Sequence, residues 1–166
     1  TGRLLYGDQL LAIYARAVLQ NHPGATVIGE VKCSHLLYKD IAAHGGDPLM
    51  AATGHSLIKS KLRETGAILA GEMSGHMFFA ARLAEIVAAS STPLSEMLAD
   101  WPATVNTPEI RVDCPDAIKF AVVNKAKRHF ASGYDVIDVD GVRLTFPDGW
   151  GLLRASNTQP ALVVRF

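Results

Sequence analysis

The sequence has few cysteines and no excess of either charge, and each absence excludes a class of protein. Its two cysteines, Cys33 and Cys114, are too few for a disulfide framework and lack CxxC spacing, so we expect buried, reduced thiols. Sixteen basic residues are matched by sixteen acidic ones, so no overall field attracts nucleic acid or an anionic membrane. Any anion-binding site must therefore be local.

Long apolar runs are also missing, which bears on where the protein works. The longest run falls far short of the roughly 20 residues that a membrane helix needs. The first residues, TGRLLYGDQLL, lack the basic and apolar regions of a signal peptide. We therefore expect a cytoplasmic protein with neither a membrane nor a nucleic acid as partner. What is present, 49% hydrophobic and 19% charged residues, is typical of a globular chain with one good core or two small ones.

Residues 1–101 alternate between helical and extended patterns, which predicts an α/β domain of stacked βα units on a mainly parallel sheet. We expect strands at residues 26–31, 48–53 and 67–73. We expect helices at residues 9–22 with Asp8 as N-cap, 35–44 with Ser34 as N-cap, 56–65 closed by Gly66, and 80–90.

Residues 102–107 break this pattern with proline at the start and just beyond the end, and we interpret them as a linker or hinge. Residues 108–166 then change period and predict a small α+β domain, with one helix on an antiparallel sheet. A half-buried strand is expected at residues 109–114. A helix should begin at Pro115, and Asp140 with Gly141 indicates a hairpin with a type I′ turn.

The loop GEMSGH, at the end of the third expected strand, is the first candidate site. Glu72 can accept two sugar hydroxyls, Ser74 can donate and accept, and the flanking glycines let a ligand approach the backbone. With His76, this inventory suits a polyol. The alternative is that Glu72 and His76 only cap the next element. A zinc site is a weaker interpretation, because these two residues lack a third and fourth ligand.

The stretch RASNTQP, at the exit of a strand in the second domain, is the second candidate. Its arginine fork, hydroxyls, amide and backbone N–H groups form a set of donors with no carboxylate among them, which suits a phosphate. The donors are Arg154, Ser156, Asn157 and Thr158. The alternative is an ordinary polar turn with a solvated arginine.

Lys32 and His55 form the third candidate, because each follows the end of an expected parallel strand. Ligands of parallel α/β sheets bind outside the carboxyl ends of the strands, and Glu72 lies at the same edge. Taken singly, such a lysine is usually solvated and such a histidine is usually a helix cap. Their shared edge favours a site.

Two long motifs carry a family resemblance that covers almost the whole chain. TGHSLIKSKLRETGAILAGEMSGHMFF and GWGLLRASNTQPALVVRF resemble the α-D-phosphohexomutases, and within them the bacterial phosphomannomutase/phosphoglucomutase group. A phosphoglucosamine mutase, the alternative within the family, typically has glutamine where Met73 stands. The resemblance therefore implies mannose and glucose phosphates as substrates.

The resemblance implies a reversible transfer of phosphate between C1 and C6 of a hexose phosphate, through a bisphosphorylated sugar. Glu72 and Ser74 would grip the 3- and 4-hydroxyls, and His76 would complete the sugar loop. Lys32 and His55 would assist charge or proton movement at the reacting end. The phosphate that is not reacting would be held by Arg154, Ser156, Asn157 and Thr158. Such roles are positional and electrostatic, which is what phosphoryl transfer needs.

The resemblance also implies that this chain corresponds to the third and fourth of four domains. The family's phosphorylated serine loop and its magnesium loop are not in the sequence, so no metal ligand is expected in this chain. Magnesium, glucose 1,6-bisphosphate as activator or intermediate, and the N-terminal domains are the cofactors and partners implied. A segment of about a dozen residues is expected between Phe79 and Ala80, and a further helix and strand after Phe166.

Three functions remain open from the sequence. The first is part of a magnesium-dependent phosphohexomutase, an isomerase that is competent only with its missing half. The second is a non-catalytic phosphosugar-binding module. The third is a structural βα domain whose polar loops are only turns.

Overall fold

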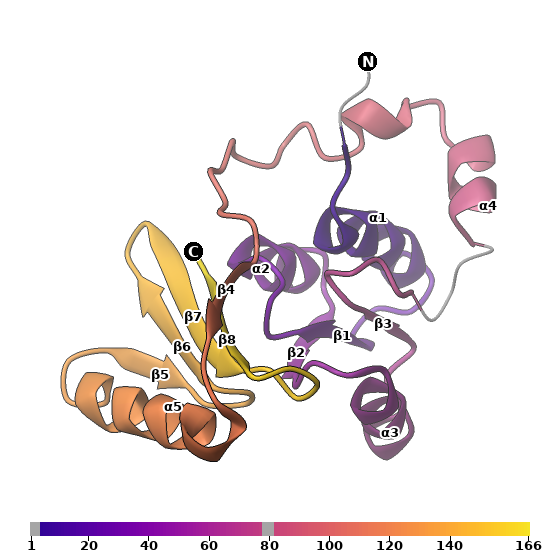
Figure 1. Ribbon diagram of the computed structural model, residues 1–166. Helices are drawn as coiled ribbons and strands as arrows, with labels where there is room; N and C mark the ends of the chain where they lie inside the picture. The colour runs from indigo at the N-terminus through magenta and orange to yellow at the C-terminus, as the bar shows by residue number, and fades with distance from the viewer. Residues whose placement is uncertain (1–3, 78–81) are drawn as a thin grey trace. The chain divides into compact units, whose positions relative to one another are not determined.

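The structure, a computed structural model, describes residues 4–77 and 82–166 (Figure 1). The position between Phe79 and Ala80, where the family resemblance implies a further segment, lies outside these residues. The chain divides between Ala103 and Thr104 into two units, called unit 1 and unit 2 from the N-terminus. No helix within the described ranges is both long and apolar enough to cross a membrane.

Unit 1 is built on three parallel strands, as the sequence predicts. The strands lie in the order β2-β1-β3, with bounds β1 Thr26–Glu30, β2 Asp47–Ala51 and β3 Leu69–Gly71. The helical elements are α1 Gly7–Leu19, α2 His35–Ala43, α3 His55–Thr65, α4 Arg82–Ala89 and the 3₁₀ turn η1 Leu94–Glu96. These alternate with the strands (Figure 1), which confirms the stacked βα arrangement.

Helices cover both faces of the unit 1 sheet because neighbouring residues of β1 point to opposite sides. Val27 packs in a core with residues of α1 and α2, such as Leu11 and Leu37. Ile28 packs on the other face in a core that includes Ile58 of α3. Both β1 side chains are fully buried. A strand covered on both faces reads as a continuous apolar run, which is the pattern of this stretch.

The capping predictions for unit 1 are partly right. Ser34 is the N-cap of α2 and accepts a hydrogen bond from the Leu36 N–H, and Gly66 ends α3 with φ +68°. Asp8 was expected to cap α1, and this is wrong, because the N-cap is Tyr6. The Asp8 carboxylate is buried in the first turn and accepts a hydrogen bond of 2.9 Å from the Ser34 N–H. It therefore joins the starts of two helices.

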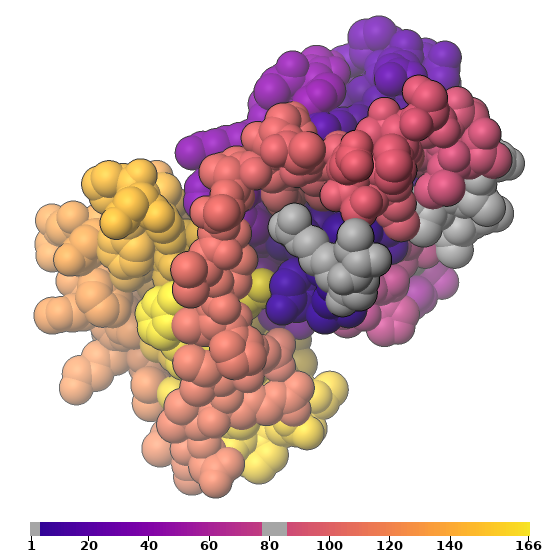
Figure 2. All heavy atoms as spheres, turned by 90° about the horizontal axis from the view of Figure 1, so that it is seen from above, coloured from indigo at the N-terminus to yellow at the C-terminus, as the bar shows by residue number. Residues whose placement is uncertain are grey.

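The residues just before the linker, residues 102–107, are hydrogen-bonded to α1 and α2, and the carboxylate of Asp40 lies at the centre of these bonds. It accepts hydrogen bonds of 3.0 Å from Arg16 Nε and from Trp101 Nε1. Arg16 also donates to the Met97 carbonyl and to Asp100. In Figure 2 the pink atoms of the residues before the linker lie against indigo and purple atoms from the first part of the chain. The chain is thus held to α1 and α2 up to Trp101.

Unit 2 is an antiparallel sheet with one helix on it, which confirms the predicted α+β arrangement. Its strands lie in the order β4-β8-β7-β6-β5. Their bounds are β4 Ile110–Asp113, β5 Asp135–Ile137, β6 Val142–Phe146, β7 Gly149–Ala155 and β8 Ala161–Arg165, and the helix is α5 Asp116–Phe130. Val123 of α5 packs on Val142, Leu144 and Leu162 of one sheet face. Cys114 is buried with them, and both cysteines are free, as expected.

Two details of unit 2 differ from the sequence-based expectation. All four residues of β4 are exposed, and none of them belongs to the hydrophobic core under α5. The β5–β6 hairpin forms, but its turn is not type I′. Gly141 has φ +92°, whereas Asp140 does not have a positive φ. The last β5–β6 pair is Ile137 with Arg143, so the connection is longer than two residues.

Candidate functional site

The carboxyl ends of the unit 1 strands bring the first and third candidates, the loop with Glu72 and the pair Lys32 and His55, to one edge of the sheet. Glu30 at the end of β1 pairs with Ala51 at the end of β2, and Gly29 pairs with Gly71 at the end of β3. The strands therefore end level with one another. Lys32, His55 and Glu72 follow these ends, and His55 is the first residue of α3.

Residues 71–77 form a loop closed by its own backbone, and we call it the sugar loop after the ligand that the sequence analysis predicts for it. Gly71 and Met77 form a β-bridge, and the Glu72 N–H donates to the His76 carbonyl at 3.0 Å. The Gly75 N–H donates to the Glu72 carbonyl at 3.0 Å, with φ +88° at Gly75. A residue with a side chain would be strained there. Backbone hydrogen bonds therefore hold the turn, and with it the positions from which its side chains project.

The side chains of the sugar loop combine one buried carboxylate with two exposed polar groups. Glu72 is only 5% exposed, and its Oε2 lies 3.6 Å from His76 Nδ1. The same ring nitrogen is hydrogen-bonded to Ser74 Oγ at 2.9 Å. The ring of His55 stands edge-on to that of His76, with centroids 6.0 Å apart. Carboxylate, hydroxyl and imidazole thus converge, which suits hydrogen bonding to neighbouring sugar hydroxyls.

Glu30 is a site residue that the sequence analysis missed. Its side chain is fully buried, and Oε1 accepts a hydrogen bond of 2.8 Å from the Met73 N–H in the sugar loop. The same oxygen lies 3.5 Å from Lys32 Nζ. Glu30 therefore ties Lys32 to the sugar loop. The available signal was an acidic residue inside the apolar stretch TVIGEV, where a carboxylate needs partners.

In unit 2, residues 156–159 lie between β7 and β8, and we call them the phosphate loop after the ligand that the sequence analysis predicts for them. Ser156 is buried, and its Oγ accepts from the N–H groups of Thr158 and Gln159 at 3.4 and 3.2 Å. Its own N–H donates to the Ala161 carbonyl. The Ser156 hydroxyl therefore shapes the loop from within. Asn157 and Thr158 are exposed at its tip.

Arg154 lies on β7 just before this loop and is 5% exposed, so it is not a solvated surface arginine. Its Nε donates to Asp140 Oδ2 at 2.9 Å. The stretch RASNTQP itself has no carboxylate, and the β5–β6 connection supplies one from outside it. The bond orients the guanidinium through Nε. Within residues 4–77 and 82–166, no hydrogen bond is found for its two Nη groups.

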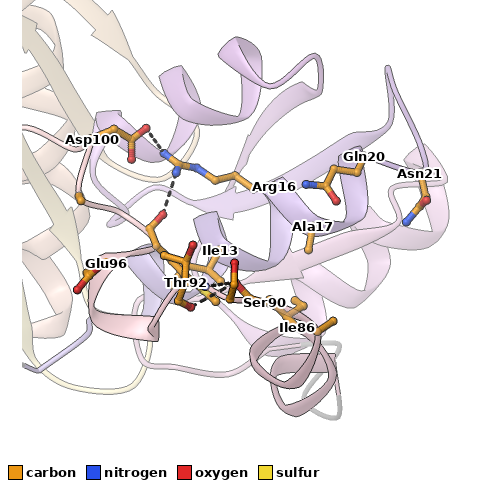
Figure 3. Close-up of a pocket in the computed structure, with 14 residues that line it drawn as sticks. Ile13, Arg16, Ala17, Gln20, Asn21, Ile86, Ser90, Thr92, Glu96 and Asp100 are labelled. Atoms are coloured by element: carbon orange, nitrogen blue, oxygen red, sulfur yellow. Dashed lines mark hydrogen bonds and ion pairs between the residues drawn. The ribbon is translucent and has the colours of Figure 1, made fainter.

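Unit 1 also has a cavity of about 940 Å³ (Figure 3). It lies between α1, α4 and residues 90–100, and Figure 3 shows Arg16 bonded to Asp100 on its wall. None of the predicted site residues lines it. The polar groups that converge at the strand ends are chemically better suited to a phosphosugar, so the cavity is not the candidate site.

The described parts of the chain hold no group of three or more His, Cys, Asp or Glu side chains arranged for a metal ion. The exposed His76 and buried Glu72 have each other and Ser74 as neighbours. Zinc or magnesium therefore has no set of ligands among these residues, and no step of the chemistry is assigned to a metal here.

Both units match known domain families. Residues 6–104 match the family described as phosphoglucomutase/phosphomannomutase, alpha/beta/alpha domain III. Residues 109–166 match the phosphoglucomutase/phosphomannomutase C-terminal domain. Together the two matches cover most of the chain.

Full-length relatives carry the same names. A phosphomannomutase/phosphoglucomutase of Pseudomonas aeruginosa is 43% identical over 180 residues, covering 100% of this chain and 39% of the relative. A phosphoglucomutase of Neisseria gonorrhoeae is 44% identical over 181 residues, covering 99% of this chain and 39% of the relative. A crystal structure of a phosphoglucomutase/phosphomannomutase family protein from Burkholderia thailandensis matches with TM-score 0.88 and 41% identity, covering 99% of this chain and 38% of that one. The chain thus spans about two fifths of the length of these relatives.

Proposed function

Because the chain belongs to the phosphoglucomutase/phosphomannomutase family, we propose that it is the sugar- and phosphate-recognising part of a phosphohexomutase. The complete protein would interconvert hexose 1-phosphate and hexose 6-phosphate of glucose and mannose, through a bisphosphorylated sugar. The observation that carries the proposal is the convergence of Glu72, Ser74 and His76 in one preformed loop beside His55. The names of the relatives favour glucose and mannose phosphates over glucosamine phosphate.

In unit 1, the buried carboxylate of Glu72 and the exposed hydroxyl of Ser74 bind two neighbouring sugar hydroxyls. His76 is hydrogen-bonded to Ser74 and completes the loop. If the 3- and 4-hydroxyls occupy the same positions in both orientations of the sugar, one site can bind it with either C1 or C6 at the reacting end. Lys32 and His55, at the same strand edge, assist charge or proton movement at the reacting phosphate, where positioned electrostatics supply most of the catalysis.

In unit 2, Arg154, Ser156, Asn157 and Thr158 bind the phosphate that is not reacting. Arg154 contributes the strongest contact, because a guanidinium binds a phosphate through charge-assisted hydrogen bonds. Ser156 shapes the loop through its bonds to the Thr158 and Gln159 N–H groups. Holding the distal phosphate converts remote binding energy into alignment of the reacting hydroxyl.

The rest of the protein completes the proposal. Since the chain spans 39% of the P. aeruginosa relative, the phosphorylated serine and the magnesium site are assigned to the N-terminal domains. Magnesium there neutralises charge on the transferring phosphate. Glucose 1,6-bisphosphate is the intermediate or activator, residues 102–107 serve as the hinge between the two domains, and the cytoplasm is the expected location.

The test is an assay of the full-length protein with glucose 1-phosphate, magnesium and glucose 1,6-bisphosphate, followed by phosphorus NMR. We expect the signal of glucose 1-phosphate to be replaced by that of glucose 6-phosphate, and mannose 1-phosphate to behave likewise. Conversion of glucosamine 1-phosphate alone would assign the protein to the other branch of the family. Binding without any conversion would favour the non-catalytic module.

A further inference from the structure

Lys119 is a buried cation that neither the sequence motifs nor the proposed contacts explain. It lies in the first turn of α5 and is 4% exposed. Its Nζ donates to the Ser156 carbonyl at 2.6 Å and to the Gln159 carbonyl at 3.1 Å, and lies 2.6 Å from Asp116 Oδ1. A lysine ammonium has three donors, and here all have partners. Two of the partners are the first and last carbonyls of the phosphate loop.

The direction of these bonds determines what the loop offers to a ligand. A trans peptide places its C=O and its N–H on opposite sides. Because the Ser156 carbonyl points to Lys119, the N–H of Asn157 in the same peptide points away from Lys119. The Gln159 carbonyl belongs to the peptide of Pro160, which has no N–H.

The other backbone donors of the loop are already used. The N–H groups of Thr158 and Gln159 donate to Ser156 Oγ. For the Asn157 N–H, no hydrogen bond is found among the residues that the structure describes. The carbonyls of Ser156 and Gln159 therefore point to an internal cation, where they do not repel an anion. The Asn157 N–H is the backbone donor that remains available to a ligand.

We propose that Lys119 is a positioning residue for phosphate binding, which holds the phosphate loop so that the Asn157 N–H is an additional phosphate donor. The proposal rests on the proposed function, since it assigns a detail of the same phosphate site. Lys119 itself does not contact the ligand. Removing its ammonium releases the Ser156 and Gln159 carbonyls, and the loop loses the arrangement that suits an anion.

The test compares Lys119→Met with Lys125→Met in the protein, using inorganic phosphate as the probe. Methionine keeps an apolar stem of similar length but removes the charge, and Lys125 is an exposed lysine of the same helix. We expect Lys119→Met to weaken phosphate binding about tenfold, the scale of one hydrogen bond to a charged group. Lys125→Met should bind as the unaltered protein does. Lys119→Arg, which keeps the charge, should recover part of the loss.

A second measurement needs no variant and covers the case in which Lys119→Met does not fold. In an amide NMR titration of the unaltered protein with inorganic phosphate, the Asn157 signal should move at least as far as that of Thr158. If Arg154 and Thr158 respond while Asn157 stays still, or if Lys119→Met binds phosphate normally, the role of Lys119 is refuted and the phosphate site stands. If none of these signals moves, the phosphate site itself is refuted.

Discussion

The sugar loop of unit 1 and the phosphate loop of unit 2 are held in shape by buried charges of opposite sign. In the sugar loop, the carboxylate of Glu30 accepts from a backbone N–H, that of Met73. In the phosphate loop, the ammonium of Lys119 donates to two backbone carbonyls. A cation that binds backbone carbonyls leaves the backbone N–H groups of the loop available to an anion. A carboxylate that accepts from a backbone N–H removes a donor that an anion could have used. The sign of the buried charge thus matches the proposed ligand, a phosphate in one loop and a neutral polyol in the other.

The two loops also resemble each other in how charged and polar side chains are arranged. Each has exposed polar groups and one buried charged residue, Glu72 within the sugar loop and Arg154 just before the phosphate loop. The buried residue is oriented by a partner, since His76 lies beside Glu72 and Asp140 holds Arg154. Orientation before binding lowers the entropic cost of recognition. The comparison therefore predicts that damage to one loop leaves the other intact.

The largest expected effect is on the support of the sugar loop. Glu30→Ala should lower the free energy of unfolding of unit 1 by about 3 kcal/mol, because it leaves the Met73 N–H unpaired and Lys32 without its nearby carboxylate. Thermal unfolding measures this change. The control is Glu64→Ala, an exposed glutamate of the same unit, which should change stability little.

Inorganic phosphate should still bind Glu30→Ala, since the phosphate loop belongs to unit 2. Equal loss of phosphate binding in this variant would show that the two loops are not independent.

The next effect is on the phosphate loop. Arg154→Ala should weaken glucose 1-phosphate binding by about 1.5 to 3 kcal/mol, the scale of a charge-assisted hydrogen bond. Calorimetric titration measures the affinity. Arg128→Ala, an exposed arginine on α5, is the matched control and should bind normally. Unchanged affinity in Arg154→Ala would contradict its role as the main phosphate contact.

A smaller effect separates sugar recognition from phosphate recognition. Glu72→Gln keeps the shape of the side chain but removes its charge, so binding of glucose 1-phosphate should weaken by about 1 kcal/mol. Affinity for inorganic phosphate should not change. Competition between the two ligands measures both. A loss that is equal for both ligands would count against a sugar contact at Glu72.

The smallest effect lies outside both loops. The hydrogen bond from Arg16 lowers the pKa of Asp100 from its ordinary value. A lowered pKa in the folded state contributes stability above the unfolded-state pKa, which is lost as the pH falls through the folded-state value. Because 61% of the Asp100 side chain is exposed, the contribution should be only about 0.5 kcal/mol.

Thermal unfolding of Asp100→Asn and of the unaltered protein should therefore differ at neutral pH and converge in acid. A difference that persists below the pH at which Asp100 is protonated would refute this ion pair as the cause.

Local features of the chain were predictable from the sequence. Ser34 caps a helix through its own neighbours, and Gly66 ends one because it adopts a positive φ. The parallel sheet followed from alternating periods, and the shared strand edge followed from parallel topology. Each of these depends on residues close in sequence or on a general rule of α/β sheets.

Features that depend on partners distant in sequence were not predictable. Asp8 lies inside the first turn of α1, whose N-cap is Tyr6, and its carboxylate bonds a residue 26 positions away. Asp140 meets Arg154 across a hairpin whose exact turn the pair Asp140-Gly141 did not determine. Ser156 Oγ accepts from two N–H groups of its own loop, which the motif did not show, and its O–H remains a donor for the proposed phosphate. The hydrogen bond from the Met73 N–H to Glu30 depends on the pairing of β1 with β3, which the sequence did not specify.

The measurement that tests the central claim most directly is an amide NMR titration with two ligands, inorganic phosphate and glucose 1-phosphate. We predict that inorganic phosphate moves the signals of Arg154 to Thr158 only. Glucose 1-phosphate should move these signals and also those of Gly71 to His76, because it carries sugar hydroxyls as well as a phosphate. A sugar loop that ignores glucose 1-phosphate, or that responds to inorganic phosphate equally, would contradict the assignment of sugar and phosphate to separate loops.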